Sequence, residues 1–306
     1  MQTLAVDLQR VTKKFGSLTA VDDLTLAIEP GEIVAFLGPN GAGKTTTIDM
    51  LLGLSRPNSG TISIYGGKPE DAIANGRVSA VMQTAGLLKD LTIKETVRLT
   101  ATLFPHARPV GEVLERAGID EIGDRLVGKC SGGQQQRLRF ALALLSEPEL
   151  MLLDEPTAGM DVEGRRDFWS AIREDAMRGR TVMFATHYLE EADAYADRIV
   201  LIRSGQIVAD GTTAEIKAMA SGRQVRATLP GADTRALADL PGVDDIELRG
   251  DTVLIRGKDS DGVARYLLNH TAARDLEITA HNLEDAFIAL TSGDTNGVEA
   301  LEGSTR

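Results

Sequence analysis

The chain of 306 residues contains a single cysteine and no long apolar run. One cysteine, Cys130, excludes an internal disulfide and indicates a reducing compartment. No stretch approaches the roughly 18 apolar residues of a membrane-spanning helix, and the N-terminal segment carries no signal-type apolar block. These absences favour a cytosolic protein without membrane spans of its own.

The chain also has fewer basic than acidic residues. The 33 lysines and arginines are outnumbered by 45 aspartates and glutamates, which gives a formal net charge of −12. Such an acidic balance argues against a protein that binds by neutralising phosphate backbones, so no nucleic-acid partner is expected. Hydrophobic residues at 42% and charged residues at 25% are ordinary for a globular chain, and the length predicts two domains.

Short apolar runs alternate with helical stretches over the first two thirds of the chain. Residues 33–37, 150–153 and 181–185 form such runs, and helical patterns at 134–146 and 163–174 lie between them. Continuous apolar strands interleaved with helices indicate a parallel sheet that is covered on both faces. The sequence therefore predicts an α/β domain over residues 1–220.

The pattern changes near residue 221. Strand, helix, strand, strand, helix, strand is the predicted order, at residues 224–229, 234–240, 245–248, 252–256, 262–271 and 276–279. This order is the split β-α-β-β-α-β arrangement, so we expect a small α+β, ferredoxin-like domain over 221–292, closed by a helix at 283–290. From 221 onward there are 9 basic and 15 acidic residues, a net of −6. Residues 293–306 are expected to form a flexible tail.

A phosphate-binding loop lies between the apolar run at 33–37 and a helix. It reads Gly38-Pro39-Asn40-Gly41-Ala42-Gly43-Lys44-Thr45, which fits the pattern G-x-x-x-x-G-K-[ST]. The glycines allow the backbone to turn N–H groups inward, and the helix adds its N-terminal dipole. Lys44 would reach the phosphates of a nucleoside triphosphate, and the Thr45 hydroxyl would help to hold Mg²⁺. A chance glycine-rich turn is the alternative.

Two carboxylates follow the apolar run 150–153. Asp154 and Glu155 would lie at the C-terminal edge of the sheet, where ligands bind in open α/β folds. We expect Asp154 to serve Mg²⁺ and Glu155 to polarise the attacking water as general base. An isolated pair of this kind would more often be an acidic turn that ends a strand, but the upstream phosphate loop favours the catalytic interpretation.

A second anion-binding element precedes the helical pattern at 134–146. Ser131-Gly132-Gly133-Gln134 places a serine and two glycines at a helix N-terminus, separate from the first loop. One phosphate cradle is enough for one chain, so the second indicates a composite site. In a head-to-tail dimer, this element of one chain would close over the nucleotide of the other.

Together these residues resemble the ATP-binding subunit of ABC (ATP-binding cassette) transporters. The resemblance covers about residues 4–215, with the elements in the family's order and at its intervals. It implies a P-loop ATPase core of ABC type with a helical subdomain at about 84–146, ATP hydrolysis, and ATP and Mg²⁺ as cofactors. The implied partners are a second copy of the chain and separate multi-span membrane permease subunits at the cytoplasmic face of the membrane.

The resemblance implies further roles. Phe15 resembles the aromatic that stacks on adenine, Gln83 the Q-loop glutamine, residues 158–161 the D-loop, and His187 the histidine that senses the γ-phosphate. Alternatively, Phe15 is a core aromatic of a strand. The predicted nucleotide-binding residues are Phe15, Gly38, Pro39, Asn40, Gly41, Ala42, Gly43, Lys44, Thr45, Thr46, Ser131, Gly132, Gly133 and Gln134. The predicted catalytic residues are Glu155, His187 and Gln83, and the predicted metal ligands are Thr45, Gln83 and Asp154.

Segments outside these motifs resemble one subgroup of the family. Residues 188–193 (Tyr-Leu-Glu-Glu-Ala-Asp) and 205–211 are typical of the family, and residues 282–287 resemble the closing helix of bacterial drug and antibiotic exporter subunits of the daunorubicin-resistance type. A soluble ABC-type ATPase acting on nucleic acid or ribosomes is the alternative. Such proteins usually carry two cassettes or a long coiled coil, and this chain shows neither. A P-loop kinase or GTPase-like switch would lack residues 131–134.

Cys130 departs from the family pattern, which usually has leucine before the signature serine. Two interpretations are open. At a helix N-terminus an exposed thiol would favour its thiolate form and react with alkylating reagents. Alternatively, Cys130 replaces leucine as a small apolar residue in the core.

Overall fold

The computed structural model describes residues 3–82, 86–219, 223–280 and 283–291. It divides into two compact units between Asp210 and Gly211, whereas the sequence predicted the boundary after residue 220. The reason for this correction is helix α8 (Thr213–Met219), which packs against α11 (Leu283–Thr291) in the second unit. Ile216 of this helix is fully buried, so the segment 213–219, which the sequence assigned to the first domain, begins the second unit instead.

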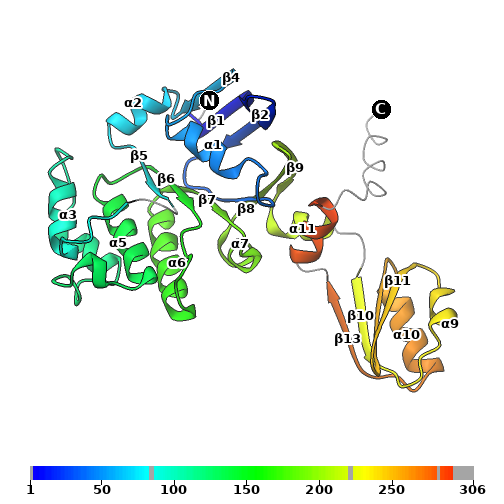
Figure 1. The fold of residues 1–306 in the computed structure, drawn as a ribbon. Helices are drawn as coiled ribbons and strands as arrows, with labels where there is room; N and C mark the ends of the chain where they lie inside the picture. Colours follow the sequence, from blue (N-terminus) through cyan, green and yellow to red (C-terminus); the bar gives the residue numbers. More distant parts are fainter. Residues whose placement is uncertain (1–2, 83–85, 220–222, 281–282, 292–306) are drawn as a thin grey trace. The chain divides into compact units, whose positions relative to one another are not determined.

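A six-stranded sheet forms the centre of the first unit (Figure 1). In sheet order its strands are β5 (Val78–Val81), β6 (Leu150–Asp154), β7 (Thr181–Thr186), β3 (Ile33–Leu37), β8 (Arg198–Arg203) and β9 (Gln206–Gly211). The first five run parallel to their neighbours. Every residue of β3, β6 and β7 is buried, which confirms the expected coverage of both faces.

The strand register brings the ends of the central strands to one edge. Leu37, the last residue of β3, pairs with Thr186, and Asp154 at the end of β6 pairs with Ala185. Loops that follow β3, β6 and β7 therefore leave the sheet side by side. This edge is where a ligand of an open α/β sheet is expected.

A smaller antiparallel sheet shares its core with the central sheet. Its order is β2 (Leu18–Ile28), β1 (Val6–Phe15) and β4 (Ser59–Ile64). Inward-facing residues such as Leu8, Leu26 and Ile64 belong to the same buried cluster as Phe36 and Leu152 of the central strands. Outside the predicted helical subdomain, the described helices of the first unit are α1 (Lys44–Leu51), α2 (Pro69–Ala74), α6 (Val162–Met177) and α7 (Leu189–Tyr195).

Three helices pack on one another within the segment predicted as the helical subdomain. They are α3 (Ile93–Ala101), α4 (Val110–Arg116) and α5 (Gly132–Leu144), and a 3₁₀ turn at Val127–Lys129 leads into the last. Helix α5 also packs on β5, the edge strand of the central sheet.

The second unit contains a four-stranded antiparallel sheet. Its order is β11 (Val243–Arg249), β12 (Thr252–Gly257), β10 (Arg223–Thr228) and β13 (Arg274–Ala280), with helices α9 (Thr234–Ala238) and α10 (Ser260–His270). This is the strand order of the predicted ferredoxin-like fold. Alternating residues such as Val225, Ala227 and Val253 are buried in the core that α9 and α10 complete. The predicted tail lies outside the described residues.

A buried ion cluster joins the helical subdomain to the sheet. Asp175, near the end of α6, is only 1% exposed and contacts the guanidinium groups of Arg116 in α4 and Arg180 before β7. Arg180 also donates from Nε to the Pro148 carbonyl at 2.7 Å. A buried carboxylate shared by two arginines compensates charges that would otherwise be desolvated without a partner.

We expect Asp175→Ala to lower the free energy of unfolding by about 3–5 kcal/mol, because two largely buried arginines lose their partner. Urea unfolding followed through the emission of Trp169, the only tryptophan and a fully buried residue of the same helix, measures this change. Asp167→Asn is the matched control. Its carboxylate is exposed and meets Arg137 at 3.2 Å, so a change of about 0–1 kcal/mol is expected. Equal effects of the two substitutions would refute the special role of the cluster.

Candidate active site

The phosphate loop is shaped by glycines between β3 and α1. Gly43 has φ +107° immediately before the helix, a conformation that a side chain would strain. A Cβ at Gly43 would also collide with the Ala20 carbonyl oxygen, and one at Gly38 with the carbonyl oxygen of Ile202. The loop is therefore held tightly between its neighbours, with its N–H groups at the N-terminus of α1.

Lys44 turns back onto this loop. Its side chain is mostly buried, and Nζ donates to the Gly38 carbonyl at 2.5 Å and to the Pro39 carbonyl at 3.2 Å. Burial lowers the pKa of Lys44, while the nearby carboxylates of Glu155 and Asp154 oppose that shift. A cation hydrogen-bonded to loop carbonyls at the N-terminus of a helix is suited to an anionic ligand.

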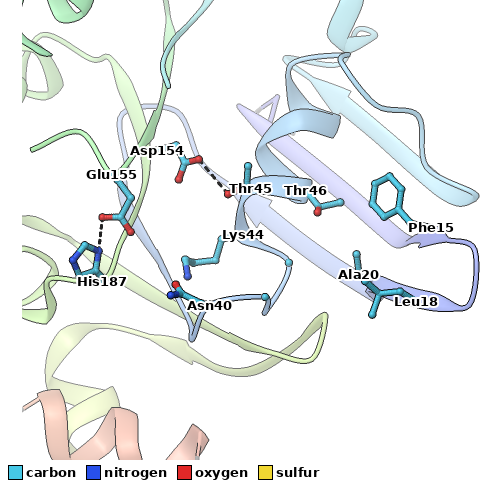
Figure 2. Close-up of a pocket in the computed structure, with 12 residues that line it drawn as sticks. Phe15, Leu18, Ala20, Asn40, Lys44, Thr45, Thr46, Asp154, Glu155 and His187 are labelled. Carbon is cyan, nitrogen blue, oxygen red and sulfur yellow. Dashed lines mark hydrogen bonds and ion pairs between the residues drawn. The ribbon is translucent and has the colours of Figure 1, made fainter. Parts of the chain in front are cut away.

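Asp154 and Thr45 bring oxygen atoms together beside the loop. Asp154 ends β6 and is buried, and its Oδ2 accepts a hydrogen bond from Thr45 Oγ1 at 3.2 Å (Figure 2). Burial raises the pKa of Asp154, and the Thr45 hydroxyl and the Lys44 charge counter it. A carboxylate and a hydroxyl next to a phosphate loop are the hard oxygen donors that suit Mg²⁺.

Glu155 and His187 contact one another next to Asp154. His187 Nδ1 lies 2.7 Å from Glu155 Oε2, and Figure 2 shows the two side chains directed toward one another. Glu155 has φ +50°, and its N–H donates to the Ala185 carbonyl of β7 at 2.9 Å. A non-glycine residue in this left-handed region is strained, and such strain is concentrated at functional sites.

One pocket of about 660 Å³ gathers most of the predicted site. It is lined by Phe15, Leu18, Ala20, Asn40, Gly41, Gly43, Lys44, Thr45, Thr46, Asp154, Glu155 and His187 (Figure 2). Phe15 is 53% exposed, so the alternative of a core aromatic is wrong. Gly38, Pro39 and Ala42 complete the same loop, and Gln83 lies outside the described residues.

Leu18 and Ala20 were missed by sequence reasoning. They line the pocket because β1 and β2 form a hairpin in which Phe15 pairs with Leu18. The tight Gly16-Ser17 turn between two alternating strands is the signal that could have placed them opposite Phe15.

The serine–glycine element lies at another pocket of the same unit. Ser131 caps α5 by accepting from the Gln134 N–H at 3.2 Å, and Gln134 Oε1 accepts from the Ser131 N–H at 3.0 Å. Ser131, Gly133 and Gln134 line a hollow of about 500 Å³ together with Gly159 and Asp161. None of residues 131–134 lines the phosphate-loop pocket. A composite site, in which these residues act on the nucleotide of another chain, requires this separation.

Comparison with known proteins identifies the family. The ABC transporter family model matches residues 21–158. Nod factor export ATP-binding protein I of Paraburkholderia xenovorans (strain LB400) is 36% identical over 300 residues, which cover 95% of this chain and 98% of that protein. The chain belongs to the ABC transporter family as an ATP-binding subunit.

Solved structures agree with this assignment. An ATP-binding subunit of an ABC transporter matches with a TM-score of 0.65 and 28% identity, over 71% of this chain and 92% of that one. A dimeric ATP-binding cassette in a post-hydrolysis state, bound to ADP and Pi, matches with a TM-score of 0.62 and 28% identity, over 68% of this chain and 98% of that one. The predicted class, an ATP-hydrolysing subunit of an ABC exporter, is confirmed.

In this ABC subunit Cys130 is a packing residue. It is 9% exposed, and its Sγ donates to the Leu126 carbonyl at 3.4 Å. Burial raises the pKa of the Cys130 thiol, opposite to the shift that an exposed helix N-terminus would cause. The burial of Cys130 supports the interpretation as a small apolar substitute for leucine and argues against an exposed, reactive thiolate.

Within the described ranges, none of the helices of this ABC subunit combines the length and the apolar character that a membrane crossing needs.

Proposed function

We propose that this ABC subunit hydrolyses ATP at two composite sites of a head-to-tail dimer. The observation that carries the proposal is the separation of the two anion-binding elements. Lys44, Glu155 and His187 share one pocket, while Ser131 lines another. This separation supports a site in which a second copy supplies the serine loop. The similar cassette solved with ADP and Pi is itself dimeric, which supports this arrangement.

Each pocket residue then has a distinct role. Phe15 offers an exposed ring for stacking on adenine, and the loop N–H groups with Lys44 bind the phosphates. Glu155 orients a water molecule and accepts its proton, while His187 holds the Glu155 carboxylate in place and faces the terminal phosphate. The Ser131 loop of the partner chain would donate to the same phosphate from the opposite side.

Asp154 and Thr45 fit a magnesium ion by the chemistry of their oxygens, and Gln83 is proposed as a further ligand. A bound Mg²⁺ would neutralise phosphate charge during phosphoryl transfer. Asp154 and Thr45 already lie 3.2 Å apart, so this chain provides the protein ligands without a large rearrangement.

Removing the metal tests this part of the proposal. We expect EDTA to abolish phosphate release from ATP and added Mg²⁺ to restore it. Asp154→Asn should raise the Mg²⁺ concentration for half-maximal activity, because one carboxylate ligand is lost. Asp167→Asn, an exposed carboxylate of α6, should leave that concentration unchanged. Full activity in EDTA would contradict the proposed metal site.

We further propose separate multi-span membrane subunits as partners, which would hold this chain at the cytoplasmic face of the membrane. The export role named for the similar protein of Paraburkholderia xenovorans supports this proposal. Nod factor is the cargo named for that protein. The sequence of this chain resembles drug and antibiotic exporter subunits, and this narrower class stays a prediction that names no cargo.

A further inference from the structure

The segment 188–193 is typical of the family, yet none of the roles above uses it. It contains Glu191 of α7, whose side chain is only 2% exposed. Its two oxygens bind two different segments of the chain. Oε1 accepts a hydrogen bond from Thr157 Oγ1, and Oε2 accepts one from Thr186 Oγ1 at 3.2 Å. Both threonines are themselves buried, so these bonds are shielded from water.

The two threonines are close in sequence to the proposed catalytic pair. Thr157 lies two residues after Glu155, and Thr186 directly precedes His187. Because Glu155 and His187 are themselves 2.7 Å apart, the contacts close into a ring. Glu191 belongs to helix α7 and hydrogen-bonds both to the segment that follows β6 and to the end of β7.

Arg165 and Trp169 of α6 also interact with the carboxylate. Arg165 Nε lies 3.4 Å from Glu191 Oε1, and the guanidinium carbon of Arg165 lies 4.4 Å from the centre of the Tyr188 ring. The Tyr188 ring in turn lies 4.1 Å from the His187 ring. The same arginine therefore provides the counter-charge for Glu191 and supports the residue beside the histidine.

Placing a carboxylate here is costly. Burial raises the pKa of Glu191, and the side chains of Thr157, Trp169 and Thr186 together with the Arg165 charge counter that shift. A buried charge needs such partners, and an apolar side chain of similar size would pack without this cost. The carboxylate has one capability that an apolar group lacks, which is to accept hydrogen bonds from two segments at once.

We propose that Glu191 is a positioning residue that clamps the segments carrying Glu155 and His187. This inference rests on the proposed roles of Glu155 and His187 in hydrolysis. Without the clamp, the segments after β6 and β7 can separate, and the pair loses the geometry that directs the attacking water. Thr157 also precedes Gly159 and Asp161 of the second hollow, so the clamp orders the D-loop segment that faces the serine loop.

The test begins with Glu191→Gln in the full chain. Glutamine keeps the volume but replaces one acceptor oxygen by an N–H₂ group, so only one threonine keeps its acceptor. We expect kcat to fall about 10–100-fold, as for other groups that orient a catalytic residue. The dissociation constant of a non-hydrolysable ATP analogue should stay unchanged, because Glu191 does not line the nucleotide pocket. Glu190→Gln, the exposed neighbour, should behave as wild type.

A second pair of variants separates positioning from general stability. Thr157→Val keeps a similar shape but removes the hydroxyl, whereas Thr157→Ser keeps the hydroxyl. We expect the valine variant to lose turnover and the serine variant to retain it. Adding Glu191→Gln to Thr157→Val should cost much less than it costs alone, because the two changes break one clamp. Far-ultraviolet circular dichroism and the urea midpoint verify that each variant is folded.

The outcomes distinguish this inference from the proposed function. Wild-type kcat in Glu191→Gln, with an inactive Glu155→Gln measured alongside, would overturn the clamp alone. Wild-type kcat in both variants would overturn the catalytic roles on which it rests. A loss of turnover that the serine variant shares with the valine variant would also overturn the clamp, because the hydroxyl would then be irrelevant.

Discussion

Glu155→Gln is expected to bind ATP normally and to lose about 10²–10⁴-fold in turnover, because an amide cannot accept the proton of the attacking water. The substitution keeps the shape of the side chain, so the β6–β7 edge should stay intact. Phosphate release under saturating ATP and Mg²⁺ measures the effect, and binding of ATP in the absence of Mg²⁺ provides the affinity.

Glu190→Gln is the control for this experiment, since it removes the same charge from an exposed position close to the site. Turnover near wild type in the Glu155 variant would show that another group activates the water. The left-handed backbone of Glu155 and its contact with His187 would then only maintain the conformation of the loop.

The second large effect concerns Ser131. We expect Ser131→Arg to abolish hydrolysis while each monomer still binds ATP, because the serine loop lines a hollow apart from the phosphate pocket of its own chain. Lys44→Ala should also be inactive, but through lost phosphate binding, since its buried ammonium is the cation of the phosphate loop.

Mixing these two inactive proteins tests whether each site is built from two chains. A mixed dimer holds one intact site, made from the loop of the Ser131→Arg chain and the serine of the Lys44→Ala chain. Activity should therefore reappear on mixing, with at most one competent site per mixed dimer. Loss of ATP binding by the Ser131→Arg monomer would instead place the serine loop in the same site as Lys44 and refute the composite model.

The central sheet and most of the site could be predicted because buried parallel strands leave a continuous signal. β3, β6 and β7 are mostly apolar, β6 and β7 end in Asp154 and Thr186, and the glycine-rich loop follows β3 directly, so the sequence shows where the ligand edge lies. The loop before Lys44 could be predicted for a similar reason, since its glycines meet a steric demand that the structure bears out.

Features that depend on tertiary packing could not be predicted from the sequence. Helix α8 has the same local pattern whichever unit it joins, and only its packing on α11 decides the boundary. The burial of Cys130 depends on how the turn at Val127–Lys129 enters α5. Glu191 looks like one of two adjacent glutamates on a short helix. Its partner Thr186 ends β7 just before that helix, but its partner Thr157 lies in the turn after β6, 34 residues away in the sequence.

The measurement that tests the central claim most directly is the mass of Glu155→Gln in solution with ATP and Mg²⁺, determined by light scattering. If two chains enclose ATP at composite sites, the slow variant should accumulate as a dimer with twice the 32.7 kDa of the chain. Ser131→Arg added to the same variant should return it to the monomer. A variant that binds ATP but remains at the monomer mass at every protein concentration would contradict the account.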